Sequence, residues 1–303
     1  MQASGRMKII FADLSLVLAS FFWGLGFVAM KDALETYPTF WLLVLRFSFS
    51  AILMGLIFRR RISGIALRDF RAGAVIGTFL FLGFAAQTLG LNYTTPGKQA
   101  FLTATYVVIV PFLSWAAKRN FPGILSFAAS AICLAGMGLL TLEGETGTGL
   151  GDVLTVVCAF FFACHILAIE HLSASRDPVT LSILQIGTVA VLSLPAALFF
   201  ESWPGFAGGS SAWSIGYTVV FCTVISFLIQ NVAQKHTPST HAAILLSLES
   251  VFGALSGILL LGEVFTLRMA AGCALILAAV LLTETGPAIA RVFTSAIRGR
   301  ERD

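Results

Sequence analysis

Apolar residues run along nearly the whole chain in stretches separated by short polar or Pro/Gly-containing breaks. A helix needs about 20 mostly apolar residues to cross the hydrocarbon core of a bilayer. The runs therefore predict an all-α integral membrane protein with ten transmembrane helices, followed by a short basic tail over residues 291–303. The predicted spans are residues 11–30, 39–58, 70–91, 97–117, 122–142, 150–170, 179–200, 211–235, 239–261 and 265–284.

The composition supports a membrane protein and excludes two other classes. Of the 303 residues, 57% are hydrophobic and 11% are charged, whereas about 25% are charged in soluble domains. A soluble fold of this size could not hide so much apolar surface, and disordered chains are richer in charge and poorer in aromatics. The first apolar run is long and similar runs follow it, so we interpret it as a span and not as a cleaved signal peptide. The five cysteines lie inside apolar runs without metal spacing, so we expect no metal and no cofactor.

Basic residues are divided unequally between the two sets of loops. With ten spans both termini lie on one side, and that side holds 15 of the 19 Lys and Arg residues. The other side holds Lys31, Lys98 and Arg268, and Arg46 lies inside a span. Since cytoplasmic loops carry the excess of Lys and Arg, we expect a multi-pass protein of the cell (inner) membrane with both termini cytoplasmic. The opposite loops are acidic, at Asp32, Glu35, Glu143, Glu145 and Glu201.

The two halves of the chain resemble each other. Matching residues follow in the same order at offsets between 139 and 143 positions. The matched pairs are Asp13 with Asp152, Arg46 with Gln185, Gln87 with Gln230, Pro96 with Pro238, and Ala100 with Ala242.

This repeat divides the chain into residues 1–145 and residues 146–290, each with five spans. Because five is odd, the second copy enters the membrane from the opposite side, which makes the repeat inverted. Secondary transporters are frequently built in this way, because two halves of opposite topology can open a shared site to each side in turn. The glycines near residue 145 are interpreted as a flexible linker and not as a phosphate loop.

Several motifs resemble those of EamA-type transporters in the drug/metabolite transporter (DMT) superfamily. The first span carries W-G-x-x-F-x-x-x-K from Trp23, and the second carries an R-F pair at Arg46. The ninth and tenth spans are similar to the closing S-L-E-P-x-F…G-E…G-x-x-L-I pattern, with Glu249 as its first glutamate. Ser250 stands where the family usually has Pro, so the sequence does not predict the kink that a proline would cause there.

The resemblance implies ten helices in two inverted five-helix repeats and a secondary transporter of small metabolites. Members often export amino acids, and YddG-like exporters of aromatic amino acids are among them. The leading hypothesis is therefore amino-acid export by alternating access, and the alternative is transport of another metabolite or drug, such as an amine or a nucleotide sugar. The expected partners are a small-molecule substrate and the lipid bilayer, without nucleic acid, for a monomer or a homodimer.

An enzyme and a channel fit the sequence less well. The chain has no G-x-S-x-G, no H-E-x-x-H and no paired carboxylates inside its spans, so we expect no catalytic residues. Channels more often assemble rings of identical charges, and the internal repeat favours a carrier.

Charged and aromatic residues inside the spans are the first candidates for a substrate site, because an intramembrane charge usually faces the protein interior. Arg46 would bind a substrate carboxylate or hold a neighbouring helix. Glu249 would carry a proton, bind an amine or serve packing. Trp23, beside two glycines, would stack on an aromatic substrate or pack between helices.

Polar side chains complete the predicted site, between the repeats at the middle of the membrane. Gln99, Thr103 and Tyr106 form a stripe at i, i+4 and i+7 ahead of Pro111, which suits a cavity lining or packing between helices. Further candidates are the amides of Gln87, Gln230 and Asn231 and the histidines His165 and His241. The amides would bind a zwitterion or join helices, and the histidines would titrate or simply be hydrogen-bonded.

Overall fold

The computed structural model describes residues 2–62, 64–94, 96–141, 149–206, 208–261 and 266–300. In these residues the chain folds into helices joined by turns and short loops, without a strand. The first half contains α1 (Gln2–Leu34), α2 (Thr39–Ile57), α3 (Arg59–Ile62), α4 (Leu67–Leu91), α5 (Pro96–Ala104), α6 (Tyr106–Lys118) and α7 (Ile124–Thr141). The second half contains α8 (Leu150–Ser173), α9 (Pro178–Phe200), α10 (Ser210–Tyr217), the π-helix η1 (Thr218–Ile225), α11 (Ser226–Ala233), α12 (Ser239–Leu246), α13 (Glu249–Leu261) and α14 (Leu267–Arg300).

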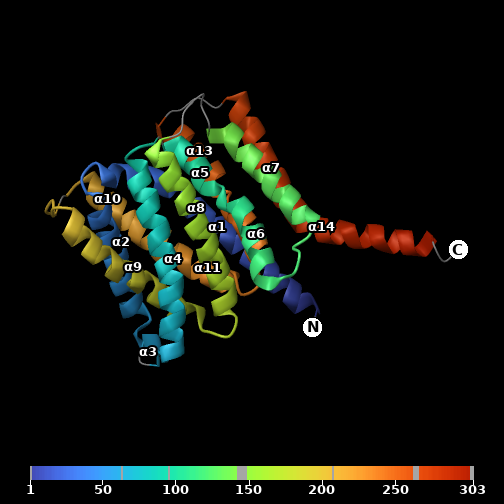
Figure 1. The fold of residues 1–303 in the computed structure, drawn as a ribbon, viewed down its shortest axis with the longest axis horizontal. Helices are drawn as coiled ribbons and strands as arrows, with labels where there is room; N and C mark the ends of the chain where they lie inside the picture. The colour runs from blue at the N-terminus through green and yellow to red at the C-terminus, as the bar shows by residue number, and fades with distance from the viewer. Residues whose placement is uncertain are drawn as a thin grey trace.

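The helices agree with the ten predicted spans. Among the described residues, seven helical stretches are long and apolar enough to cross a membrane. Two shorter apolar helices, Ile124–Leu140 and Leu267–Thr283, and the broken pair of α12 and α13 correspond to the other three spans. The backbone of α14 stays helical up to residue 300, so most of the predicted tail continues the last helix (Figure 1).

Three of the predicted spans are not continuous α-helices. The fourth is interrupted between α5 and α6 at Thr105, and the ninth is interrupted between Leu246 and Glu249. The eighth contains the π-helix η1, flanked by α10 and α11. An apolar run predicts that a segment crosses the membrane, but it carries little information on whether each turn keeps α-helical hydrogen bonding.

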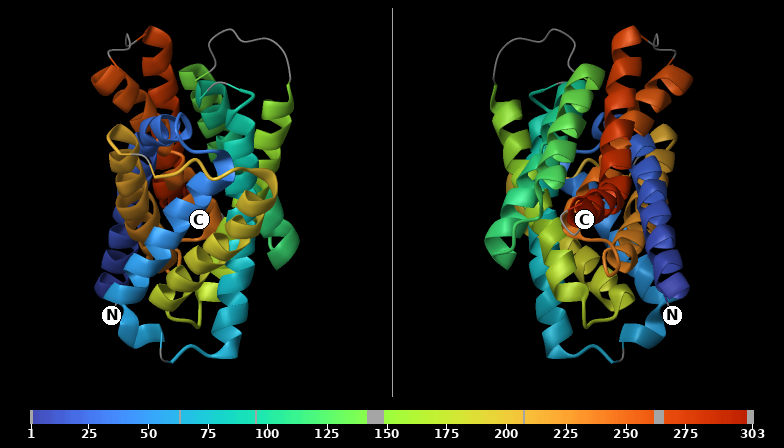
Figure 2. Two further views of the ribbon diagram at one scale, coloured as in Figure 1. Left: turned by 90° about the vertical axis from the view of Figure 1, so that its left-hand side faces the viewer. Right: turned by 90° about the vertical axis from the view of Figure 1, so that its right-hand side faces the viewer.

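The helices of the two halves are interleaved and form no separate lobes. Helix α4 of the first half packs against α8 of the second half. The corresponding contact, with the halves exchanged, joins α1 of the first half to η1 and α11 of the second. The contact of α6 with α8 is matched in the same way by that of α1 with α12 and α13. Helix α2 packs against α9, and α7 packs against α14, as the views in Figures 1 and 2 show. These matched contacts are those of two inverted five-helix repeats; the predicted boundary at residue 145 lies outside the described residues.

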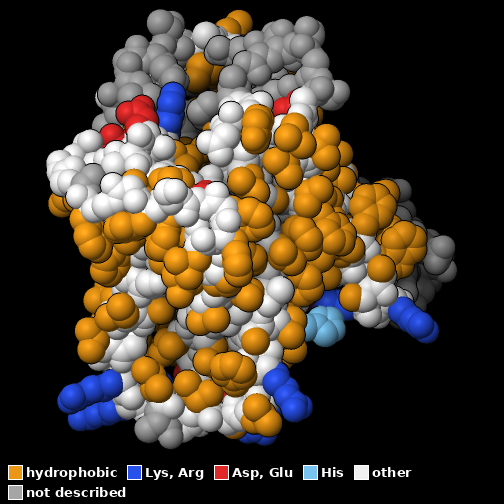
Figure 3. All heavy atoms as spheres, turned by 60° about the vertical axis from the view of Figure 1, so that its left-hand side comes forward, with side chains coloured by type: hydrophobic (Ala, Val, Ile, Leu, Met, Phe, Trp, Pro, Cys, Tyr) orange, Lys and Arg blue, Asp and Glu red, His pale blue; other side chains and the backbone are white. Residues whose placement is uncertain are grey.

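Charges gather at the two ends of the bundle. Figure 3 shows Lys and Arg side chains at the lower end of one face, acidic side chains near the upper end and hydrophobic side chains between them. Ion pairs link elements at the lower end, which we call the basic end. They join Arg61 to Asp177 at 3.0 Å, Arg176 to Asp69 at 3.5 Å, and Lys118 to Glu170 at 2.7 Å.

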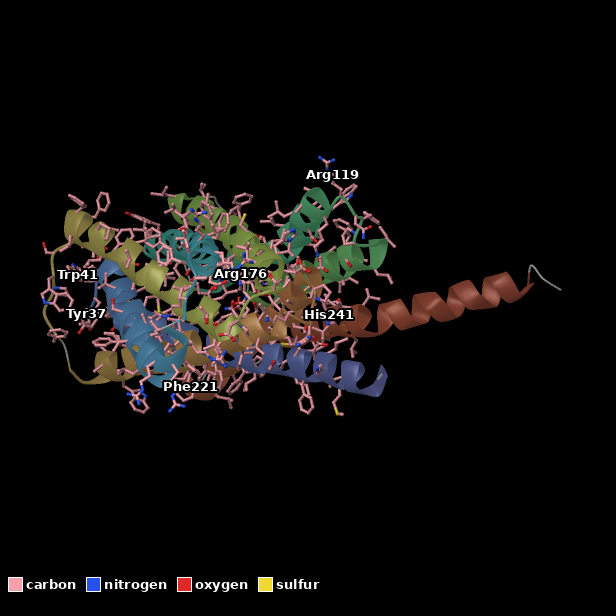
Figure 4. The ribbon with its side chains drawn as sticks, turned by 90° about the horizontal axis from the view of Figure 1, so that it is seen from below. Tyr37, Trp41, Arg119, Arg176, Phe221 and His241 are labelled. Carbon is pink, nitrogen blue, oxygen red and sulfur yellow. The ribbon has the colours of Figure 1, made fainter. Side chains whose placement is uncertain are left out.

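At the opposite end, Glu201 caps helix α2. The residue before α2 is Pro38, whose side chain has no hydrogen-bond acceptor. The Glu201 carboxylate, which follows α9, accepts hydrogen bonds from the backbone N–H groups of Phe40 at 2.9 Å and Trp41 at 3.0 Å. Figure 4 shows Trp41 beside the segment that joins α9 to α10. A carboxylate from the second half therefore satisfies the first turn of a helix in the first half.

Replacing Glu201 with alanine is expected to lower the free energy of unfolding by about 1 kcal/mol, the usual cost of losing a helix N-cap. The measurement is unfolding of the purified protein in detergent. Glu35→Ala is the matched control, because Glu35 is exposed and near the same end. Equal unfolding of both variants and the parent would show that the cap contributes nothing.

Candidate functional site

A cavity lies inside the bundle, where the two repeats meet. The space within it measures about 840 Å³, a figure that includes open solvent at its mouth. Predicted spans one, three, four, six, eight and nine all contribute to the lining. The second span adds Arg46 to the lining.

The structure brings nine of the eleven predicted residues together around this cavity. They come from both halves of the chain: Trp23, Arg46, Gln87, Gln99, Thr103, Tyr106, His165, Gln230 and Glu249.

The remaining two predicted residues do not line the cavity. Asn231 is fully buried, and its Nδ2 donates to the Phe227 carbonyl one turn earlier, at 2.8 Å. It follows Gln230 directly, so its side chain points about 100° further around the helix. His241 lies near the start of α12, on the side of the bundle from which α14 projects (Figure 4).

Two broken helices meet at the cavity. Tyr106 is the first residue of α6 and Glu249 is the first residue of α13, and both line the cavity. Their positions differ by 143, the same offset that relates Gln87 to Gln230. The inverted repeat therefore presents one broken helix from each half to the same space. Discontinuous helices of this kind form the binding sites of many secondary transporters.

Short-range backbone hydrogen bonds explain the two breaks. In the first, Thr105 N–H donates to the Leu102 carbonyl at 3.2 Å, and in the second Leu248 N–H donates to the Leu245 carbonyl at 3.2 Å. Bonds to the third residue back are tighter than α-helical ones, and within a helix they often mark a functional hinge. The second break forms although Ser250 stands where the family usually has proline, so the interruption does not depend on a proline.

Arg46 is buried and held against the eighth span. Its Nε donates to the hydroxyl of Thr223 at 2.7 Å, and one terminal nitrogen lies 3.5 Å from the Cys222 carbonyl. The guanidinium carbon lies 4.7 Å from the centre of the Phe84 ring, a cation–π geometry. The side chain is 3% exposed. These contacts are those of a residue that holds a neighbouring helix, one of the two roles predicted for it.

The π-helix η1 supplies the partners of both Arg46 and Trp23. The Trp23 indole donates to the Cys222 carbonyl at 2.7 Å. The Thr223 hydroxyl donates to the carbonyl five residues back, that of Thr218, at 2.8 Å, which fits the wider π-helical turn. Sequence reasoning missed this segment, although its Thr and Cys residues within an apolar span were a signal. A π-helix inside an α-helix frequently marks a functional site.

Aromatic rings form much of the cavity wall. The rings of Trp23 and Phe227 lie 5.3 Å apart, and those of Phe84 and Phe162 lie 5.2 Å apart. All four residues line the cavity. Among the described residues, the side chain of Glu249, which faces the same space, makes no hydrogen bond or ion pair.

The remaining polar lining is hydrogen-bonded in part. His165 Nε2 lies 3.0 Å from Oε1 of Gln185, the repeat partner of Arg46, so His165 is hydrogen-bonded, one of its two predicted roles. Gln87 Nε2 donates to Thr103 at 3.4 Å, which joins α4 to α5. Gln99 also donates to the backbone carbonyl of Gln87, so the predicted stripe both lines the cavity and packs helices. The described residues contain no cluster of His, Cys, Asp and Glu suited to a metal ion.

Known proteins match the chain along nearly its full length. The EamA-like transporter family matches twice, over residues 10–142 and 149–285. The chain belongs to this family. An uncharacterized transporter of Archaeoglobus fulgidus is 35% identical over 92% of this chain and 87% of its own length. The uncharacterized transporter YvbV of Bacillus subtilis is 21% identical over 87% of this chain and 88% of its own length.

A solved crystal structure shares the fold of this EamA-like chain. It has a TM-score of 0.76 at 17% identity and covers 89% of this chain and 95% of its own. The family and the transporters among its relatives establish a multi-pass membrane transporter of small molecules, and not an enzyme. The cavity between the two repeats is its candidate substrate site.

Proposed function

We propose that this EamA-like protein is an alternating-access carrier that exports small metabolites, amino acids being the first class to test, across the cell (inner) membrane. The observation that carries the proposal is the meeting of two repeat-related helix breaks, at Tyr106 and Glu249, in one central cavity. The nine predicted residues that line the cavity would contact the substrate. Both termini would be cytoplasmic, because the basic end carries the loops richest in Lys and Arg.

The cavity and the ion pairs support a conformation that is closed at the basic end. Lining residues reach the opposite end of the bundle, since Leu91 is the last residue of α4 and Met30 lies in the last turns of α1. At the basic end, the pairs Arg61–Asp177 and Arg176–Asp69 join the first half to the second. Export would require these pairs to separate so that substrate can enter from the cytoplasm. The repeat makes the reverse conformation accessible by exchanging the shapes of the two halves.

Locking the basic end is expected to stop transport. In the variant Arg61→Cys/Asp177→Cys, a short thiol-reactive crosslinker would hold α3 against the start of α9, and a reductant that cleaves it would restore transport. Transport is measured in proteoliposomes as saturable counterflow of a metabolite, which is first identified by mass spectrometry of the medium of overproducing cells. Each single-cysteine variant, treated in the same way, is the control.

Three outcomes would count against the proposal. Unchanged flux through the crosslinked protein would show that the basic end need not open. Flux that neither saturates nor shows counterflow would indicate a channel, and a broad screen that finds no transported metabolite would contradict the carrier itself.

A further inference from the structure

We infer that the cargo is a protonated amine with an aromatic or apolar body, bound through Glu249 of the central cavity, and that it needs no carboxylate. The inference rests on the proposed carrier function. Within its small metabolites it favours amines over the amino acids named there as the first class to test. It is carried by the unequal use of Arg46 and Glu249, the two Arg, Lys, Asp or Glu side chains that line the cavity among the described residues.

The cationic side chain already has partners within the protein. Arg46 donates through Nε to Thr223, and the Phe84 ring lies against its guanidinium. Its two terminal nitrogens lie 3.5 Å from the Met30 sulfur and from the Cys222 carbonyl oxygen. A substrate carboxylate would have to compete with these contacts and would loosen the hold of α2 on the π-helix. An α-amino acid would therefore gain little from its carboxylate here.

The anionic side chain has no such partners. Glu249 is partly exposed to the cavity, and its carboxylate has no hydrogen bond or ion pair among the described residues. Because it lies in the first turn of α13, the helix dipole stabilises its negative charge. A charge held away from water is costly unless it is paired and hydrogen-bonded, so a cation from the cargo would supply the missing partner.

Other unpartnered polar atoms at the cavity favour a cargo rich in hydrogen-bond donors. Gln230 is 1% exposed, and its Oε1 has no hydrogen-bond partner among the described residues. The Thr88 hydroxyl oxygen, on the α4 side of the cavity, is also buried and unpartnered. An ammonium group has three N–H donors and no acceptor. It could therefore bond Glu249 and still offer donors to an acceptor such as Gln230.

The walls suit an aromatic or apolar body attached to that cation. Trp23, Phe162 and Phe227 surround the same space, together with Leu80 and Leu246. Aromatic faces attract a cation within about 6 Å of the ring centre, and the effect is stronger away from water. The same rings bury the apolar part of the cargo, which explains why a cavity with so few charges can still select one class of molecule.

The first test compares three probes that share a phenyl ring and differ in charge. Binding of 2-phenylethylamine, L-phenylalanine and 3-phenylpropionate to the purified full-length protein in detergent is measured by calorimetry. We expect the amine to bind at least about tenfold more tightly than either of the others, in keeping with hydrogen bonds to a charged group. Tighter binding of L-phenylalanine than of the amine would overturn the inference and would favour an amino-acid cargo.

The second test asks whether Glu249 makes this choice. In Glu249→Gln the preference for 2-phenylethylamine over its uncharged analogue 2-phenylethanol is expected to fall toward one, whereas in the parent it is about tenfold or more. This ratio does not depend on how much of the variant folds, so a merely structural role of Glu249 would leave it unchanged. Glu35→Gln, an exposed glutamate, is the matched control and should keep the parental ratio. An unchanged ratio in Glu249→Gln would overturn the inference.

Failure of the inference and failure of the proposed function give different results. If another metabolite shows saturable counterflow while the amine does not bind, the carrier stands and the cargo assignment is wrong. If the amine binds but neither it nor any metabolite in the screen is transported, the cavity is a cation site and the proposed transport fails.

Discussion

Replacing Arg46 with alanine is expected to reduce transport more than about tenfold and to lower the free energy of unfolding by about 2 kcal/mol, the range for hydrogen bonds to a charged group. Its guanidinium joins α2 to the π-helix through Thr223 and lies against Phe84. Without it, the Thr223 hydroxyl loses its buried donor and α2 loses its hold on the eighth span. Transport is measured by counterflow, and stability by unfolding in detergent.

A double-mutant cycle separates this holding role from loss of side-chain volume. Thr223→Val removes the acceptor and nearly preserves the shape, so its effect on stability should be in the same direction and smaller. If the pair interacts, the combined variant should deviate from additivity by about 0.5–3 kcal/mol. Additive effects would show that the 2.7 Å contact contributes nothing. Arg46→Lys keeps the positive charge but loses the planar guanidinium with its several N–H donors, which a lysine ammonium cannot reproduce. Full activity of that variant would contradict the role of the guanidinium contacts with Thr223 and Phe84.

The spans and most of the site could be predicted because the membrane restricts where polar residues go. An apolar run long enough to cross the bilayer is conspicuous in the sequence, and a charge such as Arg46 or Glu249 inside one must face the protein interior. The repeat then indicated that the interior faces of both halves meet. Adjacent residues mark the limit of this reasoning: Gln230 lines the cavity and Asn231 does not, and composition alone does not fix the rotation of a helix about its axis.

Other features depend on contacts that a single run of residues does not contain. Phe84, Phe162 and Phe227 line the cavity. An apolar ring can equally well face lipid, so the sequence pattern does not distinguish a ring that faces the cavity from one that faces lipid. The π-helix is stabilised from outside, because the Cys222 carbonyl accepts from the Trp23 indole. The break before Glu249 forms without a proline. It therefore reflects how α12 and α13 pack against neighbouring helices such as α1 and α7, and not the identity of one residue.

Replacing Gly24 with valine is expected to have the largest effect on folding. A Cβ atom at this position would lie 2.6 Å from Cβ of Phe252, 2.7 Å from the Glu249 carbonyl oxygen and 2.8 Å from the backbone nitrogen of Gly253. Two of these three atoms are backbone and cannot rotate away, so α1 and α13 would have to separate. Little monodisperse protein should be recovered, and Gly24→Ala should give an intermediate yield.

The matched control for Gly24 is Gly187→Ala in α9, where an added Cβ meets no atom within 4 Å. Alanine favours the helix by about 1 kcal/mol over glycine, so this variant should fold at least as well as the parent. Yield and melting temperature in detergent measure both effects. A Gly24→Val protein that folds and transports like the parent would show that α1 does not approach α13 so closely. One of the atoms close to Gly24 is the backbone carbonyl oxygen of Glu249. The same result would therefore also contradict the packing of α1 that holds the Glu249 carboxylate in the cavity.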